Sequence, residues 1–152
     1  MAIDEQRRRF CQAAGLAAVG VAAGACGGPA CPAEPATCGT TAFSVGVRAS
    51  DVPLGQALSF QMPQAHVFVC RDSGGVYALD AGCTHLGCDV NFVSQASGFQ
   101  CPCHGATYDF DGDKPTGPAR GPLVHYALCT TPSGILIVDV NQQVDACVRL
   151  KG

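Results

Sequence analysis

The chain has 152 residues, a length that suits one domain, and its formal net charge of −3 gives no indication of nucleic-acid binding. Apolar residues make up 47% of the sequence and aromatic residues only 7%, while 19 glycines and 10 prolines favour loops and short strands over long helices. Eleven cysteines are more than a cytosolic enzyme usually carries without metal, so the composition indicates metal ligands, the disulfides of an exported protein, or both.

The first 25 residues have the layout of an export signal. Residues 7–10 (RRRF) resemble the twin-arginine pattern, and residues 13–25 form a short run rich in Ala and Gly with too little Leu for a good membrane-spanning helix. Cys26 follows Ala-Gly-Ala, as the acylated cysteine of a bacterial lipoprotein follows its signal, and is a lipidation candidate. A lipid anchor on Cys26 is slightly favoured over an uncleaved N-terminal anchor or a freely soluble mature protein.

Residues 26–42 are typical of a linker that joins an anchor to a folded head, which then comprises residues 43–152. The linker is rich in Pro and Gly and has little hydrophobic periodicity. Cys31 and Cys38 lie within it, and one hypothesis is that they close a small loop.

The head is expected to consist of short antiparallel strands, because apolar, β-branched and aromatic stretches alternate with turn sequences. The turns DSGG and TPSG each lie between two such stretches and predict two hairpins. This pattern suggests a small all-β sandwich or barrel. The expected strands are residues 43–49, 66–71, 76–79, 123–129, 135–140 and, as a last addition, 144–150.

Several Cys and His residues fall inside these expected strands. His66 and His125 are interpreted as ordinary strand residues rather than metal ligands. Buried free thiols and an additional disulfide fit the strand cysteines equally well. These cysteines are Cys70, Cys129 and Cys147.

Two motifs on loops between the strands concentrate potential metal ligands. Residues 83–88 read CTHLGC, and residues 101–105 read CPCHG. Each motif offers one Cys and one His at short spacing, whereas structural zinc sites usually pair Cys with Cys and His with His. The spacing therefore disfavours zinc. The two pairs are Cys83 with His85 and Cys101 with His104, and Cys88 and Cys103 remain.

The two motifs, including the Thr, Leu, Gly and Pro between their ligand-type residues, resemble those of the Rieske iron–sulfur family, as does the strand pattern over residues 43–140. The resemblance implies a Rieske-type antiparallel β-sandwich with a small inserted cluster-binding subdomain and one [2Fe–2S] cluster. It implies Cys83 and Cys101 as ligands of one iron, His85 and His104 as ligands of the other, and a disulfide between Cys88 and Cys103.

The resemblance also implies residues that surround the cluster. Tyr108 is at the position of a family Tyr whose hydroxyl donates a hydrogen bond to a ligand sulfur. Ala106 replaces a Ser that donates to a cluster sulfide, so we expect a potential below that of the respiratory-complex members. Leu86 is expected to shield the cluster, and Gly117 and Pro118 begin a segment that resembles the family's proline loop.

The resemblance implies one-electron transfer on the periplasmic side of the cytoplasmic membrane. The leading role is the iron–sulfur subunit of a quinol-oxidising complex, with a quinol or redox-protein donor, a cytochrome-type acceptor and N-terminal membrane association. His85 and His104 are the implied exposed ligands that couple proton transfer to electron transfer. The cysteines of the implied disulfide favour the high-potential type over the ferredoxins of ring-hydroxylating oxygenases.

Three other functions remain open from the sequence. The chain fits a stand-alone periplasmic Rieske electron carrier, and it fits the small subunit of an arsenite-oxidase-like molybdenum oxidoreductase. A non-redox metal or scaffold domain is the third. Whether turnover is intrinsic to the chain or belongs to a complex is also open.

Overall fold

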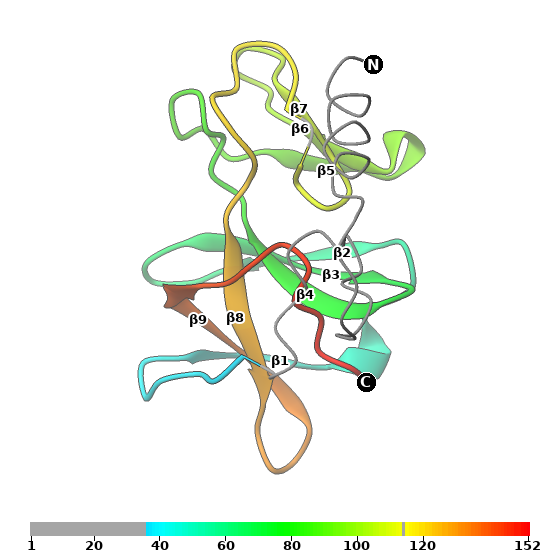
Figure 1. Cartoon of the computed structure of the whole chain (residues 1–152), viewed down its shortest axis with the longest axis vertical. Coiled ribbons are helices and arrows are strands. Elements are labelled where there is room, and N and C mark those ends of the chain that lie inside the picture. The colour runs from blue at the N-terminus through cyan, green and yellow to red at the C-terminus, as the bar shows by residue number, and fades with distance from the viewer. Residues whose placement is uncertain (1–35, 114) are drawn as a thin grey trace, which may run out of the picture. The chain divides into compact units, whose positions relative to one another are not determined.

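The computed structural model describes residues 36–113 and 115–152, and antiparallel strands dominate them (Figure 1). Helical structure in these ranges is limited to the single-turn 3-10 helices η1 (Ala49–Asp51) and η2 (Ser94–Ala96), so the all-β prediction is confirmed. The expected export signal, Cys26 and Cys31 lie outside the described residues. Within the described ranges, no helix has the length and apolar character needed to cross a membrane.

The larger sheet has six strands in the order β1-β9-β8-β4-β3-β2, and every neighbouring pair is antiparallel. Both predicted hairpins are confirmed, as β3 with β4 and β8 with β9. The six strands are β1 (Phe43–Arg48), β2 (Ala57–Gln61), β3 (His66–Asp72), β4 (Gly75–Asp80), β8 (His125–Thr130) and β9 (Ile135–Gln143).

Several strand assignments differ from the sequence analysis, including a short strand at Asn91–Val93 that was not predicted. β2 was not predicted, although Leu58 and Phe60 alternate with polar residues in it and would have been a period-two signal. The predicted strand at residues 144–150 is wrong. A turn bond from the Val148 N–H to the Asp145 carbonyl redirects this segment, and Leu150 forms only an isolated bridge with Val76.

A second, smaller sheet is inserted between β4 and β8 in the sequence and forms the upper part of the head in Figure 1. It consists of β5 (Asn91–Val93), β6 (Gly98–Gln100) and β7 (Thr107–Asp109), in the order β5-β6-β7. Gly98 allows its tight pairing, because a Cβ there would lie within 2.3 Å of the Tyr108 carbonyl oxygen. The predicted small inserted subdomain is thus present.

Strands β3 and β4 separate two apolar cores because both of their faces are buried. Successive side chains of a strand point to opposite faces, so Val67 and Val69 enter one core while Phe68 and Cys70 enter the other. The base core comprises Val52, Met62, Val67, Val69, Val76, Ala78, Leu128, Leu136 and Val138. The site core comprises Phe68, Cys70, Tyr77, Leu79, Ala81, Cys83, Val90, Phe99, Cys101, Ala106, Tyr108 and Leu123.

Candidate metal centre

The two Cys/His motifs lie on loops with the same backbone turn. In the first loop the Cys83 N–H donates to the Cys88 carbonyl at 2.8 Å, and the Gly87 N–H donates to the Cys83 carbonyl at 2.8 Å. In the second loop the Cys101 N–H donates to the Ala106 carbonyl at 2.7 Å, and the Gly105 N–H donates to the Cys101 carbonyl at 3.1 Å. Each loop therefore opens with a Cys held by the same two bonds.

Glycine is required at the fourth position after each of these cysteines. Gly87 has φ +79° and Gly105 has φ +73°, a left-handed conformation that other residues adopt only with strain. A Cβ at either position would meet no atom within 4 Å, so conformation rather than space requires the glycine. The spacing Cys-x-x-x-Gly in both motifs thus has a local cause.

Cys83 and Cys101 supply two buried thiols that are not in disulfides. Burial alone would raise the pKa of Cys83. Hydrogen bonds from the Tyr108 hydroxyl, from backbone N–H groups and from the Cys101 side chain outweigh it and lower this pKa below its ordinary value. The site therefore stabilises a thiolate, which is the form that binds metal.

Tyr108 directs its hydroxyl proton to the Cys83 sulfur, which lies 3.3 Å from the hydroxyl oxygen. The Thr84 hydroxyl is also 3.0 Å from that oxygen, but it already accepts the N–H groups of Arg120 and Gly121 at 3.2 and 3.3 Å. Burial and the bond to Cys83 both raise the pKa of Tyr108, so it remains a donor. The implied role of Tyr108 at a ligand sulfur agrees with this geometry.

His85 and His104 lie together, with ring centroids 4.7 Å apart and an interplanar angle of 85°. Nδ1 of His85 is buried and has no hydrogen-bond partner among the described residues. A buried imidazole nitrogen without a partner is costly unless it binds something. His104 is exposed, and Leu86, beside His85, is 65% exposed, so this edge of the site faces solvent.

A disulfide between Cys88 and Cys103 joins the two loops, as the resemblance implies. The sulfur of Cys101 lies within 4.8 Å of both of these sulfurs, which makes the three cysteines look like a metal-binding group. Because Cys88 and Cys103 are bonded to each other, only Cys101 of the three has a sulfur that is free to bind a metal. These three cysteines are therefore not a ligand set.

Thr84 forms hydrogen bonds that join residues 120 and 121 to the first loop, a contact that the sequence analysis missed. Its hydroxyl donates to the Gly121 carbonyl at 2.8 Å, in addition to the two bonds that it accepts. In the same segment, Gly117 has φ +67°, and a Cβ there would lie 3.4 Å from Cα of Ala106. The predicted Gly117-Pro118 segment thus borders the site, with Pro118 exposed.

His66 lies at the start of β3, as the sequence analysis predicts, and its ring also links two other segments through hydrogen bonds. Its Nε2 lies 2.6 Å from the Ser59 hydroxyl and its Nδ1 lies 2.8 Å from an Asp89 carboxylate oxygen. Because Asp89 follows Cys88, this chain of hydrogen bonds ties the first loop to β2 and β3. No short-range pattern connects the three residues. The pairing of β2 with β3 brings Ser59 to His66, and the bridge between Gly82 and Asp89 holds Asp89 beside the end of β4.

The residues present fit a metal group with mixed ligands. Two buried thiols are not in disulfides, a buried imidazole nitrogen has no hydrogen-bond partner among the described residues, and a second imidazole lies beside the first. Thiolate and imidazole are suited to iron, zinc and copper, not to calcium or magnesium. Four such donors therefore suit an iron–sulfur group with both thiolate and imidazole ligands.

Comparisons with known proteins point to the same chemistry. The sequence profile of the Rieske [2Fe-2S] domain matches residues 43–127, which is more than half of the chain. The cytochrome b6-f complex iron-sulfur subunit of Chlorobaculum thiosulfatiphilum is 40% identical over 90 residues, covering 59% of this chain and 50% of the relative. That of Chlorobaculum tepidum is 44% identical over 78 residues, covering 51% of this chain and 43% of the relative. The chain spans about half the length of these relatives.

A solved structure supports the fold alone. A chain in the complex of reduced oxygenase and oxidized ferredoxin of carbazole 1,9a-dioxygenase superposes with a TM-score of 0.51 at 21% sequence identity. The superposition covers 68% of this chain and 97% of that chain. The antiparallel architecture is therefore shared despite low identity.

Proposed function

The chain belongs to the Rieske [2Fe-2S] domain family, and from that premise we propose that it transfers single electrons as the iron–sulfur subunit of a quinol-oxidising complex. A Rieske domain holds one [2Fe–2S] cluster, which when bound takes up or releases one electron. The relatives in the comparisons are subunits of cytochrome b6-f complexes, which supports a complex of that kind as the partner.

The proposed ligands are Cys83 and Cys101 for one iron and His85 and His104 for the other. The observation that carries this assignment is the buried Nδ1 of His85, which has no hydrogen-bond partner among the described residues and lies beside the His104 ring, together with two buried thiols that are not in disulfides. Two neutral imidazoles in place of two thiolates leave the cluster less negative, so it accepts an electron more readily than a cluster with four Cys ligands.

The surrounding residues hold these ligands and exclude water. Tyr108 donates to the Cys83 sulfur, which stabilises negative charge on that sulfur. Ala106 is fully buried and offers no hydroxyl, so this position supplies no further donor. The exposed Leu86 and His104 give a redox partner access to the same edge of the site. Proton transfer at His85 and His104 stays a prediction.

We further propose that the head functions outside the cytoplasm, on a membrane-anchored chain. A disulfide between Cys38 and Cys129 and the disulfide-bonded Cys147 lie away from the two loops. Disulfides that serve only stability persist in oxidising compartments and are rare in the cytosol. They support the export signal predicted at residues 1–25 and the periplasmic location.

The test is a redox titration of the purified full chain, by voltammetry and electron paramagnetic resonance, at a series of pH values. We expect one wave for one electron, and the spectrum of a mixed-ligand [2Fe–2S] cluster on reduction. A potential that falls at alkaline pH would also bear out the proton-coupled role of the two imidazoles. Iron-replete protein without any redox wave would refute electron transfer and revive a structural metal.

The choice of complex requires a second experiment. Co-purification from membranes with a cytochrome b and a quinol-dependent reduction of the bound cluster are expected. A molybdenum enzyme as the partner would favour the molybdenum-oxidoreductase alternative. A chain that is reduced by soluble redox proteins and not by quinol would favour a stand-alone carrier.

A further inference from the structure

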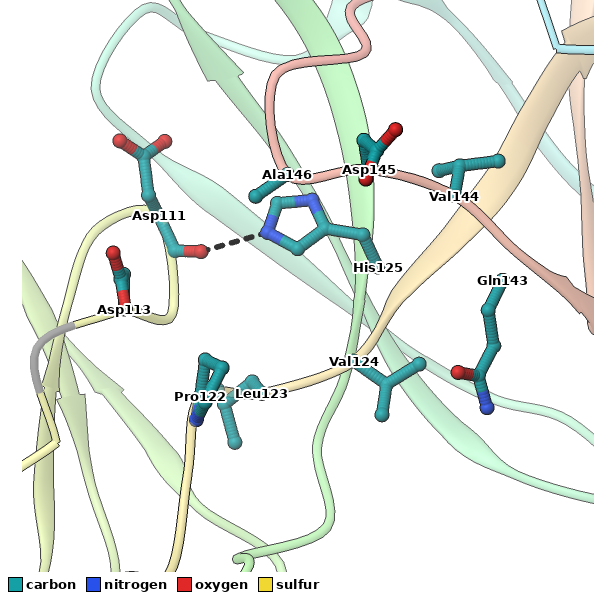
Figure 2. Close-up of a pocket in the computed structure, with 10 residues that line it drawn as sticks. All are labelled: Asp111, Asp113, Pro122, Leu123, Val124, His125, Gln143, Val144, Asp145 and Ala146. Atoms are coloured by element: carbon teal, nitrogen blue, oxygen red, sulfur yellow. Dashed lines mark hydrogen bonds between the residues drawn. The ribbon is translucent and has the colours of Figure 1, made fainter. Parts of the chain in front are cut away.

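A cavity of about 350 Å³ lies where three segments far apart in the sequence meet (Figure 2). Asp111 and Asp113 come from the turn after β7, residues 122–124 lead into His125 at the start of β8, and residues 144–146 follow Gln143 at the end of β9. None of the four proposed cluster ligands lines it. Its volume is at the lower end of the roughly 300–1,000 Å³ typical of small-molecule sites.

His125 presents an unused hydrogen-bond acceptor at this cavity. Its side chain is buried, with 5% of the residue exposed, and stacks on Tyr77 with ring centroids 5.6 Å apart. Nε2 lies 2.9 Å from the Asp111 carbonyl oxygen, which can only accept, so Nε2 carries the proton. Burial also lowers the pKa of His125, so the ring is neutral and Nδ1 is a bare acceptor.

Nδ1 of His125 is buried and has no hydrogen-bond partner within residues 36–113 and 115–152. Figure 2 shows it on the edge of the ring toward Asp145 and Ala146, opposite the bond to Asp111. A buried acceptor without a donor costs free energy, commonly about 1–3 kcal/mol. A donor supplied from outside the chain would remove that cost.

Two carboxylates at the cavity lack a positive partner in the part of the chain that the structure describes. Arg149 pairs with Asp72 and Asp111, so the charge of Asp111 is already compensated. The side chains of Asp113 and Asp145 are exposed and have no hydrogen-bond or ion-pair partner among the described residues. The charged or buried groups left unused around the cavity are therefore the two carboxylates and Nδ1, all of which accept hydrogen bonds, and the exposed Gln143 amide beside them can donate or accept.

We propose that this cavity binds a small organic cation that carries ammonium or guanidinium groups. Such a ligand would supply N–H donors to Asp113, Asp145 and Nδ1 of His125 together with positive charge. Leu123, Val124 and Val144 would pack against its methylene groups. The proposal is independent of the electron-transfer function.

The spacing of the acceptors favours an organic cation over a bare metal ion. A metal site needs its donor atoms close together. In the described part of the chain, three Cys, His or acidic donor atoms lie within 4.8 Å of one another at one place, formed by Cys88, Cys101 and Cys103. The acceptors at the cavity are thus too widely separated for a single ion and suit an extended ligand.

The test is calorimetric titration of the cluster-loaded full chain with putrescine, with butanediol as the neutral probe of the same chain length. Proton–nitrogen NMR of the His125 ring locates the binding. We expect saturable binding of putrescine, a shift of the His125 ring signals, and no binding of butanediol. Asp113→Asn and Asp145→Asn should each weaken binding about fivefold, as the loss of one partly exposed ion pair implies.

Asp89→Asn is the matched control, because it removes the same charge from an exposed site outside the cavity. It should leave putrescine affinity unchanged. Equal weakening by Asp89→Asn, equal binding of butanediol, or no saturable binding would overturn the proposal. So would Mg²⁺ binding at the His125 ring in place of putrescine. A lysine with both termini blocked mimics a lysine side chain of another protein. Binding of this probe without binding of putrescine would also overturn the proposal, because the occupant would then be a protein side chain.

Discussion

The two cores on either side of β3 and β4 differ in what fills them. The base core is aliphatic apart from Met62, and each of its side chains needs only close packing. The site core contains aromatic rings, the Tyr108 hydroxyl and the thiols of Cys83 and Cys101, which need partners as well as packing. The base core can therefore be complete without a ligand, whereas the site core depends on the loop disulfide and on the group that its donors hold.

Removal of one proposed ligand should have the largest effect and should affect the site core without affecting the base core. Cys101→Ala should abolish cluster binding while the larger sheet stays folded, because Cys101 lies in the site core alone. Iron and acid-labile sulfide analysis together with far-ultraviolet circular dichroism measures both effects. Cys70→Ala is the matched control, since Cys70 is another buried free thiol of the same core. Equal iron loss in both variants would contradict the ligand assignment.

The two described disulfide pairs should act on different cores. The Cys38–Cys129 bridge spans 91 residues and its removal should cost roughly 4 kcal/mol of unfolding free energy, against roughly 3 kcal/mol for the 15-residue span of Cys88–Cys103. Urea unfolding of the two double Ala variants checks these values. Only the second variant should release iron faster in a bleaching time course. Faster release from the Cys38→Ala, Cys129→Ala chain would show that the cores are not separate.

A cavity in the base core should destabilise the chain without changing the redox centre. Leu136 is fully buried there, so Leu136→Ala should lower the free energy of unfolding by about 3 kcal/mol. The exposed Leu54 provides the control, and Leu54→Ala should change stability by less than about 0.5 kcal/mol. A shift of the reduction potential in Leu136→Ala, measured by voltammetry, would count against this independence.

Acid should weaken the junction between the small sheet and β8 through His125. Burial lowers the pKa of His125 in the folded chain below the ordinary value of about 6.5, so the unfolded chain binds the proton more readily. This stabilisation is complete above about pH 6.5 and is lost as the pH falls toward the folded-state pKa.

His125→Gln should flatten the pH dependence of the unfolding free energy in that window, as measured by urea titrations between neutral and mildly acidic pH. Asp72→Asn serves as the comparison. Arg149 helps to lower the pKa of Asp72 although burial opposes it, so stability from Asp72 is lost only below about pH 4. An unchanged slope in His125→Gln would show that other groups control acid stability.

The smallest expected effects are changes in the reduction potential of the cluster, caused by substitutions in the site core. Tyr108→Phe removes the donor to the Cys83 sulfur and should lower the reduction potential by about 60 mV, the one-electron equivalent of one hydrogen bond to a charged group. Ala106→Ser should raise the potential by adding a hydroxyl. Voltammetry of both variants measures the changes. Shifts of the same sign in the two variants would contradict the assigned roles.

Local patterns were sufficient to predict much of the molecule. Period-two alternation and turn residues predicted both hairpins and the all-β class, and the two Cys/His motifs indicated the metal centre and, through the family resemblance, the Cys88–Cys103 disulfide. The failures have two causes. β2 and β5 are short, with five and three residues, so each offers few positions for a period-two pattern. Residues 144–150 have a strand-like composition that a turn at Asp145 overrides.

The sequence alone determined what depends on neighbours along the chain: the strands with strong alternation, the Gly positions after each loop Cys, and the ligand types that the two motifs offer. The tertiary structure alone decided which distant residues meet. The prediction that Cys38 closes a loop with Cys31 was wrong, because the sheet order β1-β9-β8 brings the chain before β1 to Cys129. The same long-range register places Ser59 and Asp89 on His66, Thr84 on residues 120 and 121, and two free carboxylates beside His125, since spacing along the chain carries no signal for contacts between distant residues.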